Sequence, residues 1–496
     1  MTGFLPDGHH IDLGCRLKGM ESMIIQNYNE LISHGNIHGR KLALEIINES
    51  LAAIDACGLT RKLVSVKGNV LRIGPLAYDL SKINRIFVLG AGKAVLQIAE
   101  ALDDILGERI TRGVVIEKRL DGMTIGRQRV ARIKNIRVLE ADHPVPDKAA
   151  VEGAREILGV AKEATAGDLV FFCVQGGCTC LTTLPVNSLS LADIRDTTDL
   201  LLQSGASIRS VNAVRSAITK LSRGRLAKYI YPAEIINLVV NDFSWALSPK
   251  GEKDTFDLGW GPAVPAAGYM EKEFEEGLSR LKEYGLWKNL PESVQHHLKA
   301  FDPRMGSLTA EDFKVLGIQY HTFILAGPQD AAESAFTAAK RMNIEPMILS
   351  TCMEGEASQV GFMFAAVAKE LSRNGRPLKP PCVIISAGET TVTLQGEYGQ
   401  GGRNQESVLS AALKIHGGRD IVIASVGTDG TDGPTSIAGG IADGFTVKRA
   451  EAQGISLSEH LRKHNSSFVL SELGDAIRFN QPGNNVCDLS LIVIHD

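Results

Sequence analysis

The sequence repeats one local pattern several times: a short apolar run, then glycines or an acid, then an amphipathic stretch. Residues 86–92 (IFVLGAG) show it clearly, because the apolar run ends in glycines and is followed by the helical pattern KAVLQIAEALDDIL. Similar runs are found at 168–177, 234–242, 381–390 and 420–430. Strands alternating with amphipathic helices are typical of a mostly parallel sheet with helices on both faces. The pattern therefore predicts an α/β fold.

The length of the chain indicates two domains, since 496 residues exceed what one core usually organises. The repeating pattern weakens between 245 and 320, where 245–265 resembles a long loop rich in Gly and Pro and 288–318 resembles a hinge or linker. It resumes at 321–327 and continues to a last strand at 489–494. We therefore expect two α/β domains with a boundary near 290–320.

The remaining elements follow from periodicity. Residues 22–58 are expected to form two helices, broken at Gly35 and at His38–Gly39, and TVTLQG (391–396) is expected to add a hairpin strand. Asp147 is a candidate N-cap for the next helix. Further strands are predicted at 113–118, 136–142 and 346–352, and further helices at 147–164, 191–205, 272–287, 356–373 and 403–415.

Charge and hydropathy argue against nucleic acid and membrane partners. The net charge is −4 and basic residues do not cluster, since the mildly basic stretch Arg127–Arg137 is broken by apolar residues and is expected to be a solvated strand edge. No run of about 18 apolar residues is present, so no membrane span is expected. The first 20 residues lack the apolar core of a signal peptide.

The cysteines indicate a reducing compartment, the cytoplasm. Eight of them are scattered along a long chain, which does not suggest a disulfide framework. Cys173, Cys178 and Cys180 lie close in sequence, but they lack a second Cys/His pair at zinc spacing. We expect buried or loop thiols there.

Six loops share a composition that suits anion binding. In open parallel sheets, ligands bind beyond the carboxyl ends of the strands. Glycines there let backbone N–H groups approach an oxyanion, and a following helix N-terminus adds a positive dipole. Lys93 and Arg403 each begin a helix after glycines and offer a cation to a phosphate. The six loops are GAGK (90–93), QGGCT (175–179), NDFS (241–244), SAGETT (386–391), GQGGRNQE (399–406) and GTDGTDGPT (427–435).

Four carboxylates in these loops complement the cations: Asp242, Glu389, Asp429 and Asp432. Carboxylate oxygens at strand ends suit Mg²⁺ that is shared with substrate phosphates. Phosphoryl transfer needs this mixture of metal, cations and an acid or base near the attacking hydroxyl. The loops therefore predict a phosphoryl-transfer site.

Each residue also has a structural explanation. Asp-Gly is a common turn dipeptide, and Asp432, which precedes Gly-Pro-Thr, fits a structural role better than Asp429 does. Asp242 and the segment GGRNQE fit ordinary helix caps, and Lys93 fits a solvated first-turn lysine. The coincidence of six such loops favours the site over these alternatives.

Standard motifs are incomplete. A Walker A loop is absent, because Phe87 and Ala94 occupy positions that it requires to be Gly and Ser or Thr. The dinucleotide pattern GxGxxG is half present, with Gly90 and Gly92 followed by Val95, which leaves a nicotinamide enzyme open. No HExxH, GxSxG or kinase HRD pattern is found.

From about residue 22 onward the sequence resembles the glycerate 2-kinases of the MOFRL type, some of which are labelled hydroxypyruvate reductase. The resemblance is strong in the order and spacing of its motifs. The motifs that carry it are GAGKA (90–94), DHPVPD (142–147), SGASIxxVNAVR (204–215), GPAVP (261–265), EGEA (354–357), AGETTVT (387–393), GGRNQE (401–406) and GTDGTDGPT (427–435).

The resemblance implies an extension (1–21), a Rossmann-like N-terminal domain (22–300) and a smaller C-terminal MOFRL-type α/β domain (301–496), with the active site in a cleft between them. It also implies ATP and Mg²⁺, with transfer of phosphate to the 2-hydroxyl of D-glycerate. Lys93 and Arg403 resemble the family's catalytic pair. The predicted site comprises catalytic Lys93, Arg403 and Asp429; substrate- or nucleotide-binding Gly90, Gly92, Gly176, Gly177, Arg215, Gly388, Glu389, Gly401, Gly402 and Asn404; and metal ligands Asp242 and Asp432.

Several loops depart from the family pattern. VQGGCTC (174–180) replaces Ser-Gly-Gly-Gly-Ser, Asn241 replaces the Ser of a strand-ending Ser-Asp, and NQPGNNVCD (480–488) replaces Thr-Gly-Pro-Thr-x-Thr-Asn. Ser216-Ala217 and Ser222-Arg223 stand where Lys-His and Lys-Gly are usual. These changes remove cations and hydroxyls from expected ligand loops. We therefore expect an altered acid, larger or less anionic than glycerate.

Three functions remain open from the sequence. The leading hypothesis is a cytoplasmic ATP- and Mg²⁺-dependent kinase that acts on glycerate or a related sugar acid. The second uses the same cations on a carboxylate without ATP, as an isomerase, a lyase or an NAD(P)H-dependent reductase. The third is a small-molecule sensor with an inactive site. Homo-oligomerisation is left open.

Overall fold

The structure is a computed structural model of the chain. It describes residues 23–119, 124–204, 208–242, 261–266, 271–394, 397–480 and 484–495. The predicted N-terminal extension and the part of the predicted loop between 245 and 260 lie outside these residues. Among the described helices, none combines the length and the apolar composition that crossing a bilayer requires.

The chain forms two compact units. Of the described residues, unit 1 contains those between 56 and 240 and between 261 and 325, and unit 2 contains 23–55, 241–242 and those from 326 onward. The division differs from the predicted domains in two respects: the first helices of the chain belong with the C-terminal residues, and the boundary follows residue 325 instead of residue 300. The domain limits inferred from sequence stay a prediction.

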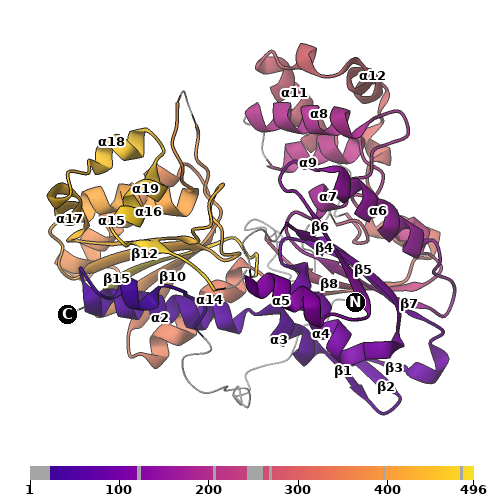
Figure 1. Ribbon diagram of the computed structural model, residues 1–496, viewed down its shortest axis with the longest axis horizontal. Helices are drawn as coiled ribbons and strands as arrows, with labels where there is room; N and C mark the ends of the chain where they lie inside the picture. Colours follow the sequence, from indigo (N-terminus) through magenta and orange to yellow (C-terminus); the bar gives the residue numbers. More distant parts are fainter. Residues whose placement is uncertain are drawn as a thin grey trace. The chain divides into compact units, whose positions relative to one another are not determined.

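Unit 1 is built on a six-stranded sheet in the order β6-β5-β4-β7-β8-β9 (Figure 1). The central strand β4 is wholly buried and pairs in parallel with β5 and β7. The pairs β5–β6 and β7–β8 are also parallel, which confirms the predicted mostly parallel sheet. The strands are β4 (Ile86–Gly92), β5 (Ile110–Lys118), β6 (Ile136–Ala141), β7 (Leu169–Val174), β8 (Glu234–Val240) and β9 (Tyr320–Ala326).

Helices cover this sheet and form a second apolar cluster beside it. Asp147 caps the helix after β6 by accepting a hydrogen bond from the Ala150 N–H at 2.9 Å, as predicted. Helices α8, α9, α11 and α12 enclose the second cluster (Figure 1). The helices are α4 (Val95–Leu106), α6 (Lys148–Ala161), α8 (Leu191–Gln203), α9 (Ile208–Ala217), α11 (Glu271–Glu283) and α12 (Glu292–Ala300).

Unit 2 contains a mixed sheet in the order β10-β11-β15-β12-β13-β14. Strand β15 lies antiparallel between β11 and β12, so β11 and β12 end at the edge where β15 begins. In register, Asp488 of β15 is therefore opposite both Gly388 and Gly427. The strands are β10 (Glu345–Met353), β11 (Cys382–Gly388), β12 (Ile421–Gly427), β13 (Gly439–Asp443), β14 (Ala476–Ile477) and β15 (Asp488–Ile494).

Helices cover both faces of the unit 2 sheet. Helices α15 (Ala357–Asn374) and α16 (Arg403–Ile415) pack on one face, and α2 (Ile37–Ala53) and α14 (Pro328–Arg341) pack on the other (Figure 1). The fully buried Arg40 of α2 binds Asp475 at 2.8 Å and also pairs with Asp443. This ion network joins the first long helix to residues near the end of the chain.

Four local predictions were wrong. Helix α2 runs through His38–Gly39, because Gly39 serves close packing: a Cβ there would lie 2.6 Å from Val422 Cγ2. The predicted linker contains α12 and the capped helix α13 (Ala310–Leu316). The basic stretch begins as helix α5 (Thr124–Arg132), which Arg129 joins to Glu100 of α4 at 2.5 Å. The described residues of the predicted hairpin strand, 391–394, form only an isolated bridge.

Candidate active site in two charged clusters

Three loops meet at the carboxyl edge of the unit 1 sheet. Lys93 lies in the turn between β4 and α4, and its backbone N–H donates to the Gly176 carbonyl after β7 at 2.9 Å. Gly177 has φ +84°, and a Cβ there would lie 2.9 Å from His143 Cδ2 and 3.2 Å from Lys93 Cγ. Only glycine therefore lets the β7 loop pass so close to the other two. The structure brings Lys93, Gly176 and Gly177 together, as the sequence suggested.

Arg215 of α9 belongs to the same cluster. Its side chain is buried, with the residue 5% exposed, and it contacts the loop after β6 by donating to the Pro144 carbonyl at 3.4 Å. The Cys180 thiol donates to the same carbonyl at 3.2 Å, and the nearby charge of Arg215 opposes the rise in the pKa of this thiol that burial causes. Among the described residues, no carboxylate forms an ion pair with Arg215. A buried guanidinium without a counter-ion is costly, so this cluster is suited to receive an anion.

His143 is a member of the cluster that the site prediction missed. It follows β6, and no described residue hydrogen-bonds either ring nitrogen. Burial lowers the pKa of His143 well below its usual value, and the positive charges of Lys93 and Arg215 lower it further. The imidazole is therefore neutral at physiological pH. A signal was present, since the predicted strand 136–142 ends immediately before this residue.

The second cluster lies in unit 2, at the edge where β11 and β12 end. Arg403, the first residue of α16, donates from Nε to Asp488 Oδ2 at 2.7 Å and from Nη2 to Asp488 Oδ1 at 2.8 Å. Glu389 lies 3.2 Å from Nη2 of the same guanidinium. Burial raises the pKa of Asp488 to about 6, although Arg403 opposes the shift. Arg403 is thus already held by carboxylates.

Asp488 was absent from the predicted site for a topological reason. The sequence rule looks for ligand-binding residues after the carboxyl ends of strands. Asp488 instead begins β15, which runs antiparallel to its neighbours and so starts at the edge where they end. Only the strand order shows that it faces Arg403.

Asp432 caps helix α16. Its carboxylate accepts hydrogen bonds from the backbone N–H groups of Asn404 at 3.2 Å and Gln405 at 2.9 Å, and from Gln405 Nε2 at 3.0 Å. Gly402 admits this cap, since a Cβ there would lie 2.2 Å from Asp432 Cγ. This structural role accounts for a fully buried acid. A metal role for Asp432 stays a prediction.

The other predicted acids are only partly engaged. Asp429 follows β12 and accepts hydrogen bonds from the Thr431 N–H and hydroxyl at 3.0 and 3.1 Å. Asp242 accepts one from Asn485 at 2.9 Å within unit 2. No group of three or more His, Cys, Asp or Glu side chains in the described chain is arranged to hold a metal. In kinase sites Mg²⁺ is bound by only one or two protein carboxylates together with phosphate oxygens of the substrate, and the carboxylates of Asp429 and Asp242 fit that kind of site.

The remaining predicted glycines lie where the backbone closely approaches a neighbour. At each position a Cβ would come within 2.5 Å of another atom. Such contacts explain glycine without a ligand, so their binding roles stay predictions. The residues are Gly90, Gly92, Gly388 and Gly401.

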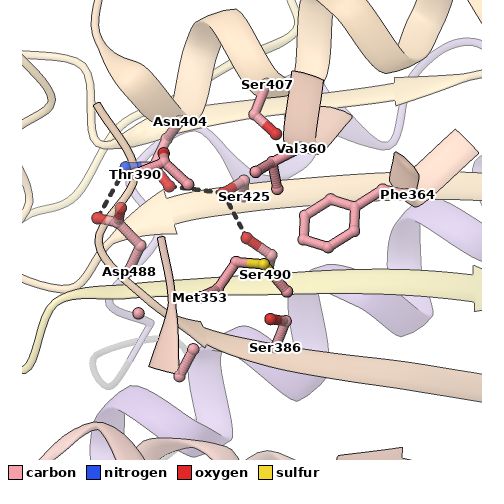
Figure 2. Close-up of a pocket in the computed structure, with 12 residues that line it drawn as sticks. Met353, Val360, Phe364, Ser386, Thr390, Asn404, Ser407, Ser425, Asp488 and Ser490 are labelled. Carbon is pink, nitrogen blue, oxygen red and sulfur yellow. Dashed lines mark hydrogen bonds between the residues drawn. The ribbon is translucent and has the colours of Figure 1, made fainter. Parts of the chain in front are cut away.

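A small pocket, lined in part by Asn404 and Asp488, lies between the unit 2 sheet and helices α15 and α16 (Figure 2). Ser425 donates to Asn404 Oδ1 at 2.5 Å and hydrogen-bonds Ser490 at 2.7 Å. The hydroxyls of Ser386 and Ser407 are buried without a partner. The volume of about 10 Å³ is near that of one water molecule, so this pocket is too small for a sugar acid.

The two clusters therefore differ in chemistry. In unit 1, Arg215 lies near the buried His143, and no carboxylate of the described residues forms an ion pair with Arg215. In unit 2, Arg403 lies in a fixed orientation between acids, and Asn404 donates to both Asp488 at 2.9 Å and Asp432 at 3.2 Å.

Comparison with known proteins covers both units. A domain of unknown function (DUF4147) matches residues 42–299, and the MOFRL family matches residues 382–488. The glycerate 2-kinase of Pyrococcus horikoshii is 33% identical over 92% of this chain and 97% of its own length. The D-glycerate 2-kinase of Thermotoga maritima is 32% identical over 92% and 98%.

A solved structure has the same fold. The crystal structure of glycerate kinase from Thermotoga maritima matches with a TM-score of 0.69 at 32% identity, covering 92% of this chain and 99% of that one. Both relatives are therefore more than 30% identical over nearly the whole length of both proteins. The chain therefore belongs to the glycerate 2-kinase family of the MOFRL type.

Proposed function

We propose that this protein is a phosphotransferase that moves the γ-phosphoryl group of ATP to a hydroxyl of glycerate or a related sugar acid. The observation that carries the proposal is the buried Arg215, which forms no ion pair with a carboxylate of the described residues and lies, like Lys93, near His143. Relatives that match the chain over its length are named glycerate 2-kinases, which supports the same reaction.

The two clusters would divide the work. Lys93 and Arg403 would neutralise the charge that builds up on the transferring phosphoryl group. Asp429 and Glu389 would supply carboxylate oxygens to a Mg²⁺ ion that arrives with the nucleotide. Arg403 suits its role because the clamp by Asp488 fixes the guanidinium before a ligand binds. ATP, Mg²⁺ and a cytoplasmic location are parts of this proposal.

The acceptor need not be glycerate itself. Ser216 and Ala217, beside Arg215, replace the Lys-His that the family usually carries, which removes up to two positive charges from the neighbourhood of this cluster. A less cationic neighbourhood favours an acid with less negative charge or with more hydroxyl groups. The family relatives do not favour the alternative of an enzyme that works without ATP.

An ADP-release assay tests the proposal. Purified protein with ATP and Mg²⁺ is offered D-glycerate, D-threonate and D-gluconate in turn, and at least one acid should accelerate ADP release. Arg403→Ala should abolish that acceleration. ADP release that no acid accelerates, together with thermal stabilisation by NADH but not by ATP–Mg²⁺, would overturn it.

A further inference from the structure

We propose that the carboxylate of the acid substrate binds Arg215 in unit 1 and that His143 accepts the proton of the hydroxyl that is phosphorylated. This inference rests on the proposed function and deepens it. It assigns a role to His143 and commits the unit 1 cluster to the acid and not to the nucleotide.

Arg215 supplies the first argument. Its guanidinium is buried, its contacts to the Pro144 carbonyl and the Cys180 thiol carry no full negative charge, and the described residues provide no acid for it. A carboxylate matches the planar fork of an arginine with two parallel hydrogen bonds. The acid substrate would thus supply the counter-ion that the folded chain omits.

The acids near this cluster argue against a nucleotide there. ATP would bring Mg²⁺, which needs oxygen ligands from the protein. Asp142 and Asp147, which flank the β6 loop, are both already ion-paired to Arg119, at 2.6 and 2.7 Å. The carboxylates that suit Mg²⁺ lie instead in unit 2, where Glu389 and Asp429 follow β11 and β12.

The position of His143 supplies the second argument. Its ring lies against the Gly177 turn, with Nε2 only 3.0 Å from the place of a Cβ on that glycine, and the described chain hydrogen-bonds neither ring nitrogen. A neutral imidazole has one nitrogen lone pair that can take a proton. The charged groups that act on it are Lys93 after β4, Lys118 at the end of β5 and Arg215 of α9.

The charges around His143 make its basicity depend on whether the acid substrate is bound. The positive charges of Lys93 and Arg215, added to burial, keep the pKa of His143 low in the free protein. A carboxylate on Arg215 would cancel part of that field and make the imidazole more basic. His143 would therefore act as a base mainly when the acid is bound.

The proposed step conserves atoms and charge. The hydroxyl oxygen forms a bond to the γ-phosphorus of ATP, and its proton moves to the free nitrogen of His143. The bond between that phosphorus and the β,γ-bridging oxygen breaks, and ADP leaves with the electron pair. The imidazolium then returns its proton to water.

Two variants and two matched controls test the inference. His143→Gln should lower kcat by about 100-fold or more, the range for loss of a general base, while the Kd for D-glycerate changes less than threefold in calorimetry. Arg215→Lys should raise the Kd for D-glycerate about tenfold or more and leave the Kd for ATP–Mg²⁺ unchanged. His296→Gln and Arg195→Lys change exposed residues of unit 1 and should match wild type in both measurements.

The outcomes separate this inference from the proposed function. If wild type turns over an acid and His143→Gln retains kcat within twofold, only the role of His143 is overturned. If Arg215→Lys weakens ATP–Mg²⁺ and not the acid, the cluster is a nucleotide site and the inference fails. If wild type releases no ADP with any acid, the proposed function fails. If wild type also binds no D-glycerate, the proposed carboxylate site at Arg215 is overturned as well.

Discussion

The two units place an arginine at the edge of a sheet in opposite electrostatic states. Arg215 in unit 1 is buried and has no acid as an ion-pair partner among the described residues, whereas Arg403 in unit 2 binds Asp488 through two hydrogen bonds and lies near Glu389. A buried charge without a counter-ion weakens folding and favours an incoming anion. An arginine that is paired with carboxylates is held in one orientation, but it attracts an incoming anion less than an unpaired arginine does. The difference suggests that unit 1 selects a ligand and that unit 2 positions one.

Removing each arginine gives the largest expected effects. Arg403→Met leaves Asp488 buried without its cation, so we expect a loss of about 3 kcal/mol in the free energy of unfolding and a fall in kcat of about 10³-fold. Arg215→Met removes a charge that has no acid, so its free energy of unfolding should change by less than about 1 kcal/mol although activity falls. Urea unfolding and the ADP assay measure both.

The same pair of variants can contradict the proposed difference between Arg215 and Arg403. Equal losses of stability in the two variants would mean that Arg215 is compensated as fully as Arg403. The exposed Arg195 provides the control, since Arg195→Met should leave both stability and activity near wild type.

The next largest expected effect is a pH dependence of stability that arises from Asp488. The pKa of Asp488 is about 6 in the folded chain and near 3.8 when unfolded. At pH values between 3.8 and 6, the folded state therefore holds the proton more tightly than the unfolded state does. Protonation thus favours folding, and this contribution is full below pH 3.8 and is lost as pH rises through 6. A pKa shift of about two units corresponds to about 3 kcal/mol in the free energy of unfolding.

Asp488→Asn should remove that dependence. Relative to the variant, wild type should lose stability as the pH rises from 4.5 to 6.5, as measured by the difference between their melting temperatures at each pH. A constant difference across this range would show that the Arg403 clamp keeps Asp488 ionised throughout.

Ligand binding gives a smaller, specific effect. D-glycerate at ten times its Kd should stabilise wild type by about 1.4 kcal/mol, since it binds only the folded chain. Arg215→Met should show no such gain at that concentration, while Arg195→Lys should show all of it. Thermal denaturation with and without the acid measures the shift, and an undiminished gain in Arg215→Met would move the anion site elsewhere.

The serines of the small pocket give the smallest effect. Ser425→Ala removes a hydroxyl that donates to Asn404 and should cost about 1 kcal/mol. Ser407→Ala removes a buried hydroxyl that has no partner, so the expected change is less than about 0.5 kcal/mol. Urea unfolding of both variants compares them, and a larger loss for Ser407→Ala would indicate that a bound water uses that hydroxyl.

Long, periodic elements could be predicted from the sequence. Helix α16 has the predicted limits 403–415, because glycines precede it and an amphipathic pattern follows. Strand β13 was missed, because its glycines resemble a loop; the structure requires them, since a Cβ at Gly439 would lie 2.0 Å from the Ser425 carbonyl oxygen of β12.

The sequence places candidate site residues where a helix begins after glycines, as at Lys93 and Arg403, and their roles stay predictions. Asp488 could not be found in that way, because its place depends on an antiparallel strand from the end of the chain. Nor could the sequence show that Arg215 lacks an acid and that Arg403 has two. Those facts depend on which side chains meet after folding.

The ion network of Arg40 also bears on how the protein is made. Helix α2 is synthesised before unit 1, whereas Asp443, Asp475 and the strands on which α2 packs are synthesised after it. Nearly all of unit 1 is translated in the interval. A nascent chain must therefore carry α2, with the positive charge of Arg40 unmatched by these acids, while unit 1 is synthesised, which makes α2 a natural segment for a chaperone to shield.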